Sequence, residues 1–160
     1  MDQELIVLYQ RAINCPIDAL AREVLNLAER VSQNPRVSYR VKGSQELAKK
    51  MDLKKTESIF DIDDVYGMRI LVFSVEEVYA VMTVIRKSFP SFLDHDYIAT
   101  PKTRFDKPHL IGKCLRLLQV IAYRNAIPFE VQVTTFEFNN MNESLHDEYH
   151  REKYNLPTTG

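Results

Sequence analysis

The first 34 residues carry apolar side chains at helical spacing, in two stripes that a proline separates. One stripe lies within residues 2–13 and the other within residues 17–31. Pro16 suits the first turn of the second helix, and Asn34-Pro35 disfavours its continuation. Neither helix can bury its stripe alone, so the pattern predicts an N-terminal helical hairpin over residues 1–34 that packs on the rest of the chain.

Beyond Pro35 the spacing of apolar residues changes between that of strands and that of helices. Strands are predicted at 37–41, 66–73, 96–99, 115–123 and 129–135, and helices at 43–51, 76–89 and 136–154. Residues 157–160 are predicted to form a loose tail. This order of elements predicts a single α+β domain over residues 35–156.

Two of the predicted strands indicate how the sheet is faced. Residues 115–123 are apolar on both faces, which is typical of a central strand. Residues 129–135 alternate, with Phe129, Val131 and Val133 on one face and Glu130, Gln132 and Thr134 on the other. We therefore expect a mixed sheet of four or five strands, with helices on one face and a partly polar opposite face where chemistry would be found.

Length and composition narrow the class of protein. The 160 residues are 45% hydrophobic and 27% charged, which fits one globular domain and excludes a disordered or low-complexity protein. With a net charge of −1, no global positive field exists to bind duplex nucleic acid. Cys15 and Cys114 form no C-x-x-C motif, and no apolar run approaches the ~20 residues of a membrane span. The N-terminal residues show no signal-like pattern, so we expect a cytoplasmic protein.

Cations gather in the strand at 37–41 and the helix after it: Arg40, Lys42, Lys49, Lys50, Lys54 and Lys55. A cationic strand face that leads into a helix N-terminus is suited to bind phosphate, because amide groups and the helix dipole add to the side-chain charge. A solvated edge strand and a lysine-rich helix surface explain the same residues, and the local pattern by itself favours this second interpretation.

Three aspartates, Asp61, Asp63 and Asp64, precede the strand that holds Gly67 and Arg69. A carboxylate at the start of a strand can hold Mg²⁺, which takes a few carboxylates together with phosphate oxygens of a substrate. The planar guanidinium of Arg69 could stack on a base. An acidic turn whose aspartates accept backbone hydrogen bonds is the alternative, and local spacing alone favours it.

Glu130 and Gln132 are neighbours on the polar face of an otherwise apolar strand. If the sheet brings Asp64 near Glu130, two carboxylates share one site, and a divalent cation is the natural compensation for their repulsion. The exposed face of an antiparallel sheet accounts for the pattern equally well.

Taken in chain order, these groups form a series of motifs. They are Arg40-x-Lys42, Lys50, Asp64-x-x-Gly67-x-Arg69, Asp96-Tyr97-Ile98-x-x-Pro101-Lys102, Glu130-Val131-Gln132-Val133 and His150-x-x-x-Tyr154. The series resembles the synthetase domain of the RelA/SpoT family over roughly residues 40–154. The resemblance implies a nucleotidyltransferase-like α+β fold. It also implies transfer of the β,γ-pyrophosphate of ATP to the 3′-hydroxyl of GDP or GTP, which gives the alarmones ppGpp and pppGpp.

The resemblance further implies roles for individual residues. Asp64 and Glu130 would hold Mg²⁺ and carry the chemistry, with Glu130 or a bound water as the base. The ATP site would contain Arg40 and Arg69 on either side of the adenine and, facing phosphates, Lys42, Lys50 and Lys102. The implied partners are ATP and a guanine or related nucleotide, and a homo-oligomer stays open as an alternative to a monomer.

One departure from the family pattern concerns the ATP side. Glu46 stands where active members have a serine between the Arg-x-Lys pair and the second lysine. An anion that faces ATP phosphates is unfavourable. Because Glu46 and Lys50 are spaced i,i+4 on the predicted helix, we expect them to pair with each other.

The other departures concern the acceptor side. The family's Asn-Gly-Tyr-x-Ser-x-His segment, whose tyrosine stacks on guanine, is replaced by residues 103–109, and Thr134-Thr135 replaces the Arg-Thr that follows Glu-x-Gln-x. The candidate acceptor-site residues are then Phe105, His109, Gln132 and His150. The chain either uses a different acceptor or is a synthetase fold that has lost catalysis and binds nucleotides or a partner.

A zinc metallohydrolase is a weaker alternative. His146 and His150 are spaced i,i+4 on one face of the predicted C-terminal helix, a geometry that can bind zinc. However, Asp147 stands where the zinc-protease motif has Glu, and no third ligand is evident. An exposed polar helix explains these residues more simply.

Overall fold

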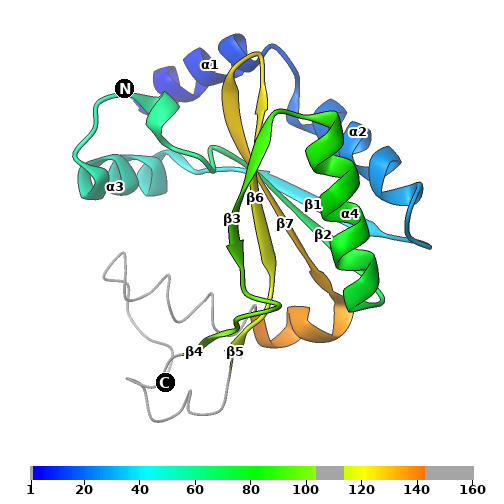
Figure 1. Cartoon of the computed structure of the whole chain (residues 1–160). Coiled ribbons are helices and arrows are strands. Elements are labelled where there is room, and N and C mark those ends of the chain that lie inside the picture. Colours follow the sequence, from blue (N-terminus) through cyan, green and yellow to red (C-terminus); the bar gives the residue numbers. More distant parts are fainter. Residues whose placement is uncertain (1, 104–113, 143–160) are drawn as a thin grey trace.

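The computed structural model describes residues 2–103 and 114–142 (Figure 1). Its helices are α1 (Asp2–Ile13), α2 (Ile17–Glu29), α3 (Ser44–Lys54) and α4 (Val75–Ser88), with a 3₁₀ turn η1 (Ile59–Asp61). Its strands are β1 (Arg36–Val41), β2 (Tyr66–Val72), β3 (Ser91–Asp96), β4 (Lys102–Thr103), β5 (Cys114–Leu115), β6 (Leu118–Arg124) and β7 (Ile127–Thr135). Residues 136–142, directly after β7, are also helical.

The main sheet contains five strands in the order β1-β2-β7-β6-β3. The pair β2–β7 is parallel, and the three other pairs are antiparallel. β4 and β5 pair separately as a small second sheet. The predicted α+β domain with a mixed sheet is therefore confirmed, with five as the number of strands, and β6 lies inside the sheet as its apolar faces indicated.

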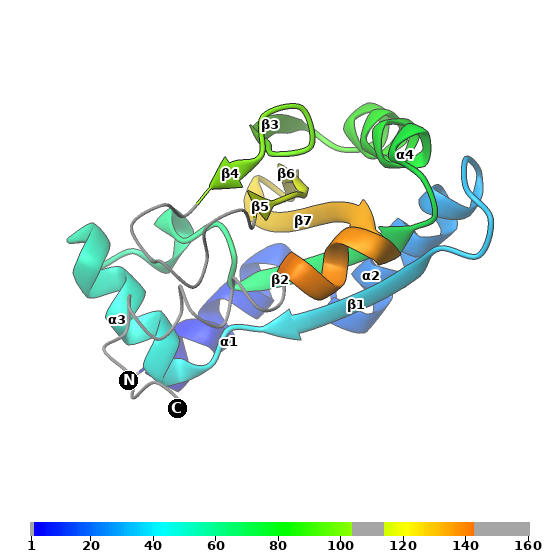
Figure 2. The same cartoon turned by 90° about the horizontal axis from the view of Figure 1, so that it is seen from below.

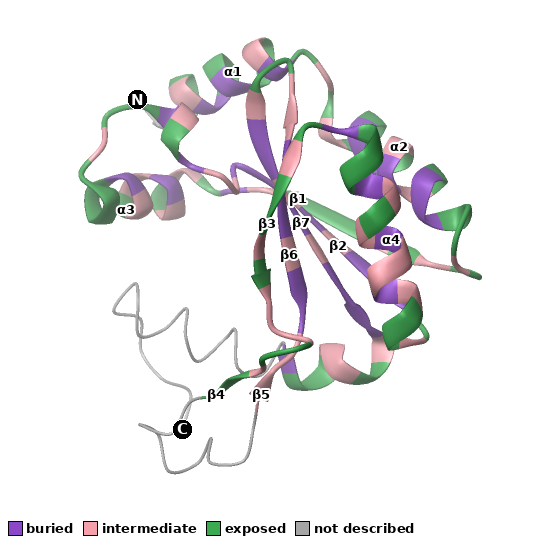
Figure 3. Ribbon diagram, in the orientation of Figure 1, coloured by how far each residue is buried: buried purple, intermediate pink, exposed green. Residues whose placement is uncertain are grey.

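Helices α2 and α4 lie together on one side of the sheet, whereas α3 lies apart from them, near α1 (Figures 1 and 2). Apolar residues of α1, α2 and α4 form one buried core with alternate residues of the strands, among them Met68 and Ile70 of β2 and Val131 of β7. The Tyr9 hydroxyl of α1 donates a hydrogen bond to the Pro128 carbonyl oxygen of β7. Figure 3 shows β6 and β7 mostly buried, whereas β1 at the sheet edge is largely exposed.

The strand predicted at 96–99 is wrong, because β3 lies earlier, at Ser91–Asp96. The Asp96 carboxylate accepts hydrogen bonds from the backbone N–H groups of Ile98 and Ala99, at 3.0 and 2.9 Å. A side chain that captures the backbone two and three residues later turns the chain away from the sheet.

The strand predicted at 115–123 is interrupted at residues 116 and 117, between β5 and β6. There the Arg116 carbonyl oxygen accepts hydrogen bonds from the side chains of Thr134 and Asn142, at 2.7 and 2.8 Å. These side chains take the place of a neighbouring strand. Within the helix predicted at 136–154, residues 136–142 are helical, and the remainder lies outside the described residues.

Among the described residues, no helix combines the length and the apolar character that crossing a membrane requires.

Candidate functional site

The register of the sheet produces two rows of residues across the face opposite the core. The first row crosses all five strands and consists of Ser38, Arg69, Gln132, Gln119 and His95. The second row consists of Arg40, Gly67, Glu130, Ile121 and Phe92. Side chains alternate between the faces along a strand, so the polar members Arg69, Glu130 and Gln132 share one face. The parallel pairing of β2 and β7 thus brings together two motifs that are about 60 residues apart.

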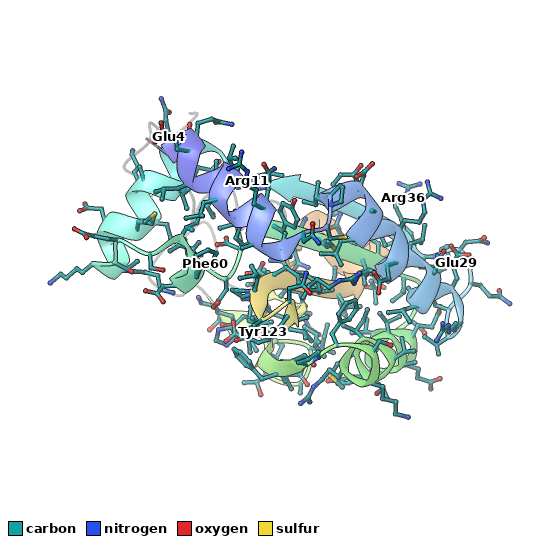
Figure 4. The ribbon with its side chains drawn as sticks, turned by 90° about the horizontal axis from the view of Figure 1, so that it is seen from above. Glu4, Arg11, Glu29, Arg36, Phe60 and Tyr123 are labelled. Atoms are coloured by element: carbon teal, nitrogen blue, oxygen red, sulfur yellow. The ribbon has the colours of Figure 1, made fainter. Side chains whose placement is uncertain are left out.

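Asp64 lies two residues before β2 and four residues after Phe60. Figure 4 labels Phe60 on the side of the molecule where α3 lies, away from Arg36. The two carboxylate oxygens of Asp64 bind different lysines. Oδ1 is 2.6 Å from the Lys50 Nζ of α3, and Oδ2 is 3.0 Å from the Lys42 Nζ at the end of β1. The structure therefore joins the basic and the acidic candidate residues in one cluster.

The two lysines determine the charge state of this carboxylate. Burial by itself would raise the pKa of Asp64, but the ammonium groups of Lys50 and Lys42 outweigh it and hold the pKa below its usual value. Asp64 is thus an anion at neutral pH. The Asp61 carboxylate, in contrast, accepts a hydrogen bond of 2.6 Å from the side-chain hydroxyl of Thr56.

Glu130 lies on β7 with both carboxylate oxygens bound by side-chain amides. Gln132 Nε2 donates to Oε1 at 2.9 Å, and Gln119 Nε2 donates to Oε2 at 3.2 Å. Burial and the negative charge of Asp64 raise the pKa of Glu130 to about 7, although Lys50 and Lys42 oppose the shift. The negative charge of Glu130 is therefore under-compensated by the positive charges around it. Part of the cause is Asp64, the carboxylate with which Glu130 was predicted to share a site.

Arg69 donates hydrogen bonds to two side chains on the polar face. Its Nε donates to Gln132 Oε1 at 3.1 Å, and its Nη1 donates to Asn139 Oδ1 at 3.2 Å. Because Gln132 also donates to Glu130, one amide connects the arginine to the carboxylate. The guanidinium plane is thus fixed in direction on the polar face, which suits the predicted contact with a base.

The predicted pairing of Glu46 with Lys50 is wrong. Glu46 Oε2 instead lies 2.6 Å from Arg40 Nη2 and 4.0 Å from Lys42 Nζ. The prediction used only the spacing of Glu46 and Lys50 along α3. The turn at Gly43 brings the end of β1 beside the first turn of α3, so Glu46 meets Arg40 instead. Lys50 is left to bind Asp64, and Arg40 is engaged by an anion.

The Asp96-Tyr97 motif lies at the other edge of the sheet. Asp96 accepts a hydrogen bond from the Tyr79 hydroxyl at 2.8 Å in addition to its two backbone bonds, so its role in this structure is to shape a turn. Tyr97 stacks on His95, with ring centroids 4.7 Å apart, and the Lys102 ammonium lies 5.9 Å from the Tyr97 ring. Lys102 is exposed, separate from the pair Lys42 and Lys50.

Several predicted site residues cannot be placed in this arrangement. Phe105, His109, His146 and His150 lie outside the described residues. Conversely, the structure adds Gln119, Asp94 and Asn139 to the polar face, and the sequence analysis missed all three. One indication of Gln119 was present in the sequence: it is a polar residue within an otherwise apolar predicted strand.

The donor set fits Mg²⁺. Within residues 2–103 and 114–142, no three His, Cys, Asp or Glu side chains gather closely enough to hold a metal by themselves. Mg²⁺ keeps few protein ligands and completes its coordination with water and substrate phosphates. Two carboxylates, one of them with an under-compensated charge, next to two lysines that can accompany phosphate, suit this ion better than a zinc site built from protein ligands alone.

A family model described as a region found in RelA / SpoT proteins matches residues 39–154. Among solved structures, the small alarmone synthetase 2 from Bacillus subtilis has 23% sequence identity and a TM-score of 0.67, over 98% of this chain and 84% of that chain. A GTP pyrophosphokinase family protein from Streptococcus pneumoniae has 19% identity and a TM-score of 0.67, over 97% and 79%. The B. subtilis small alarmone synthetase 1, bound to its product pppGpp, has 20% identity and a TM-score of 0.65, over 97% and 82%.

Proposed function

The chain belongs to the RelA/SpoT family, and from that premise we propose that it is a cytoplasmic nucleotide pyrophosphokinase. It would transfer the β,γ-pyrophosphate of ATP to the 3′-hydroxyl of GDP, GTP or a related acceptor. The observation that carries the proposal is the cluster in which Lys42 and Lys50 bind Asp64, whose negative charge helps to raise the pKa of Glu130. Relatives of the same fold, solved with pppGpp and with AMPCPP, are consistent with nucleotide ligands of this class.

The reaction requires positioning and neutralisation of charge more than covalent participation by the protein. Asp64 and Glu130 would hold Mg²⁺, which when bound neutralises phosphate charge. Lys42 and Lys50, which bind Asp64 in this structure, are the cations available to phosphates of ATP. Arg69, fixed by Gln132 and Asn139, offers its guanidinium plane to the base.

In the transfer, the 3′-oxygen of the acceptor forms a bond to the β-phosphorus of ATP. The bond from that phosphorus to the oxygen shared with the α-phosphate breaks, and AMP leaves with that oxygen. The hydroxyl proton must be taken up during the transfer, and the proposed base is Glu130 or a water bound to the cation.

A nucleotide-binding module without transfer is the second candidate, and one contact favours it. Arg40, which the family resemblance places against the adenine, forms an ion pair of 2.6 Å with Glu46. Active members have a serine in place of this glutamate. If the pair persists with nucleotide, one side of the base loses its cation.

Incubation of the protein with ATP, Mg²⁺ and each of GDP, GTP, GMP and ATP as acceptor, followed by ion-exchange chromatography, tests the first candidate. AMP together with a pyrophosphorylated acceptor is expected from the wild type and not from Glu130→Gln. Glu137→Gln, an exposed glutamate in the helix at 136–142, is the matched control. If no acceptor yields AMP and a new product, transfer is contradicted. Calorimetry with ATP and Mg²⁺ then tests the second candidate. A nucleotide-binding module must bind ATP, so the absence of a binding signal would contradict it.

A further inference from the structure

Four side-chain hydrogen bonds connect strands β2, β7, β6 and β3 across the polar face. Arg69 donates to Gln132, Gln132 donates to Glu130, and Gln119 donates to both Glu130 and Asp94. The last two bonds share one donor atom: Gln119 Nε2 lies 3.2 Å from Glu130 Oε2 and 2.8 Å from Asp94 Oδ2. Gln119 is therefore the connection between the proposed cation ligand and an acid on the edge strand.

The chemistry of the three groups fixes the orientation of the amide. In the ionised form that would bind a cation, the carboxylate can only accept hydrogen bonds, and the amide nitrogen of glutamine is the only donor atom of that side chain, with one hydrogen for each acid. The amide oxygen would repel both. Asp94 thus holds Gln119 with its nitrogen toward Glu130, and His95 Nε2 lies 3.7 Å from Asp94 Oδ2.

We propose that Gln119 is a positioning residue for the cation site: it fixes the Glu130 carboxylate in the orientation that binds Mg²⁺ with ATP, and Asp94 fixes Gln119. This inference rests on the proposed function. An amide uses one lone pair of a carboxylate oxygen and leaves the other lone pairs for a cation. Hydrogen-bond partners of metal ligands restrict their rotation, and their loss typically costs ~10–100-fold in metal affinity.

A purely structural role for Gln119, as a tie between strands, makes a different prediction. β6 already pairs with β7 and with β3 through its backbone, on either side of Gln119. If the Gln119 side chain only strengthened the pairing between these strands, Gln119→Leu and Asp94→Asn would lower the melting temperature by similar amounts and leave cation binding unchanged. The positioning role predicts instead that the two variants differ in their effect on the cation.

The test measures by calorimetry how much Mg²⁺ strengthens ATP binding, as the ratio of the dissociation constants in EDTA and in Mg²⁺. The test compares wild type with Gln119→Leu, Gln119→Asn and Asp94→Asn. The matched control is Gln33→Leu, at an exposed glutamine between α2 and β1. We expect the ratio to fall at least tenfold in Gln119→Leu, severalfold in Asp94→Asn, where the amide still reaches Glu130, and not at all in Gln33→Leu.

The outcomes separate this inference from the function on which it rests. If wild type binds ATP equally in EDTA and in Mg²⁺, the proposed function fails and the positioning role fails with it. If wild type shows the Mg²⁺ effect and Gln119→Leu retains it within twofold, the positioning role alone is wrong. Gln119→Asn, whose shorter amide stays polar, gives the same decision if the leucine variant does not fold. Its ratio must also fall below that of wild type.

Discussion

Lys42 and Asp64 form an ion pair of 3.0 Å in which the lysine side chain has only 4% of its surface exposed. The contact joins the residue that follows β1 to a residue two positions before β2, and the Lys42 backbone N–H also donates to the Val65 carbonyl oxygen at 2.8 Å. A buried ammonium is tolerated only where anions surround it. The pair therefore belongs to the stability of the fold as well as to the proposed site.

Asp64→Asn should destabilise the protein, because it leaves the Lys42 ammonium with only the more distant Glu46. Removal of one partner from a buried pair costs about 3 kcal/mol. Urea denaturation measures this loss. The double variant Lys42→Met with Asp64→Asn removes both charges and should recover most of the stability. A double variant as unstable as Asp64→Asn alone would contradict the buried-charge explanation.

Glu130→Gln should change how stability depends on pH. The folded state binds a proton at Glu130 with a pKa of about 7, whereas an exposed glutamate in the unfolded chain has a pKa of about 4.3. Between these values the folded state holds the extra proton, so wild-type stability falls as the pH rises through this window. Above pH 7 the loss of stability amounts to about 4 kcal/mol at most.

Denaturation of wild type and Glu130→Gln in EDTA, at pH values from 5 to 8, measures the difference directly. The stability of the variant relative to wild type should increase as the pH rises. A difference that stays constant over this range would show that Glu130 titrates at its ordinary value. EDTA is needed because a bound cation would stabilise the Glu130 anion and lower its pKa.

Gly67→Ala should separate ligand binding from folding. Gly67 lies between Arg40 and Glu130 in their row, and a Cβ added there would meet no atom within 4 Å. Glycine in a strand costs conformational entropy, so stability should stay equal or rise by up to about 1 kcal/mol. The new methyl group projects onto the polar face, and binding of ATP with Mg²⁺ should weaken severalfold in calorimetry. Unchanged affinity would place the nucleotide away from Gly67.

Glu46→Ser, which restores the residue of active family members, should release Arg40. The pair is largely exposed at Arg40, with 58% of that side chain accessible, so its loss should alter stability by less than about 1 kcal/mol. If Arg40 contacts the adenine, ATP affinity should rise severalfold. Glu57→Ser, at another exposed position, is the control. A decrease in affinity would mean that Glu46 itself contributes to nucleotide binding.

The parts of the fold that follow from local periodicity could be predicted from the sequence. The alternation from Phe129 to Thr135 gave the correct faces of β7, and the apolar run before it gave an inner strand. The errors arose where a side chain replaces a backbone partner. Asp96 ends β3, and the bonds of Thr134 and Asn142 to Arg116 separate β5 from β6. The spacing of apolar residues along the sequence does not reveal hydrogen bonds of this kind between side chains and the backbone.

The candidate site could be predicted only as far as its motifs extend. Asp64 was a candidate because it precedes a strand, and Glu130 because it is polar on an otherwise apolar strand, while their role as cation ligands came from the family resemblance. Gln119 was missed because its importance depends on the register between β6 and β7, which no single segment encodes. The partner of Glu46 was predicted wrongly because spacing along a helix ignores the neighbouring strand, where Arg40 lies closer.

The parallel pairing of β2 and β7 also has a consequence for biosynthesis. β7 is the last strand of the main sheet in chain order, and it inserts between β2 and β6, which precede it. A nascent polypeptide that ends before residue 127 has Asp64 and both lysines but no Glu130, and its β2 lacks the inner neighbour. Both carboxylates of the proposed cation site are therefore present only after the last strand of the main sheet has been translated.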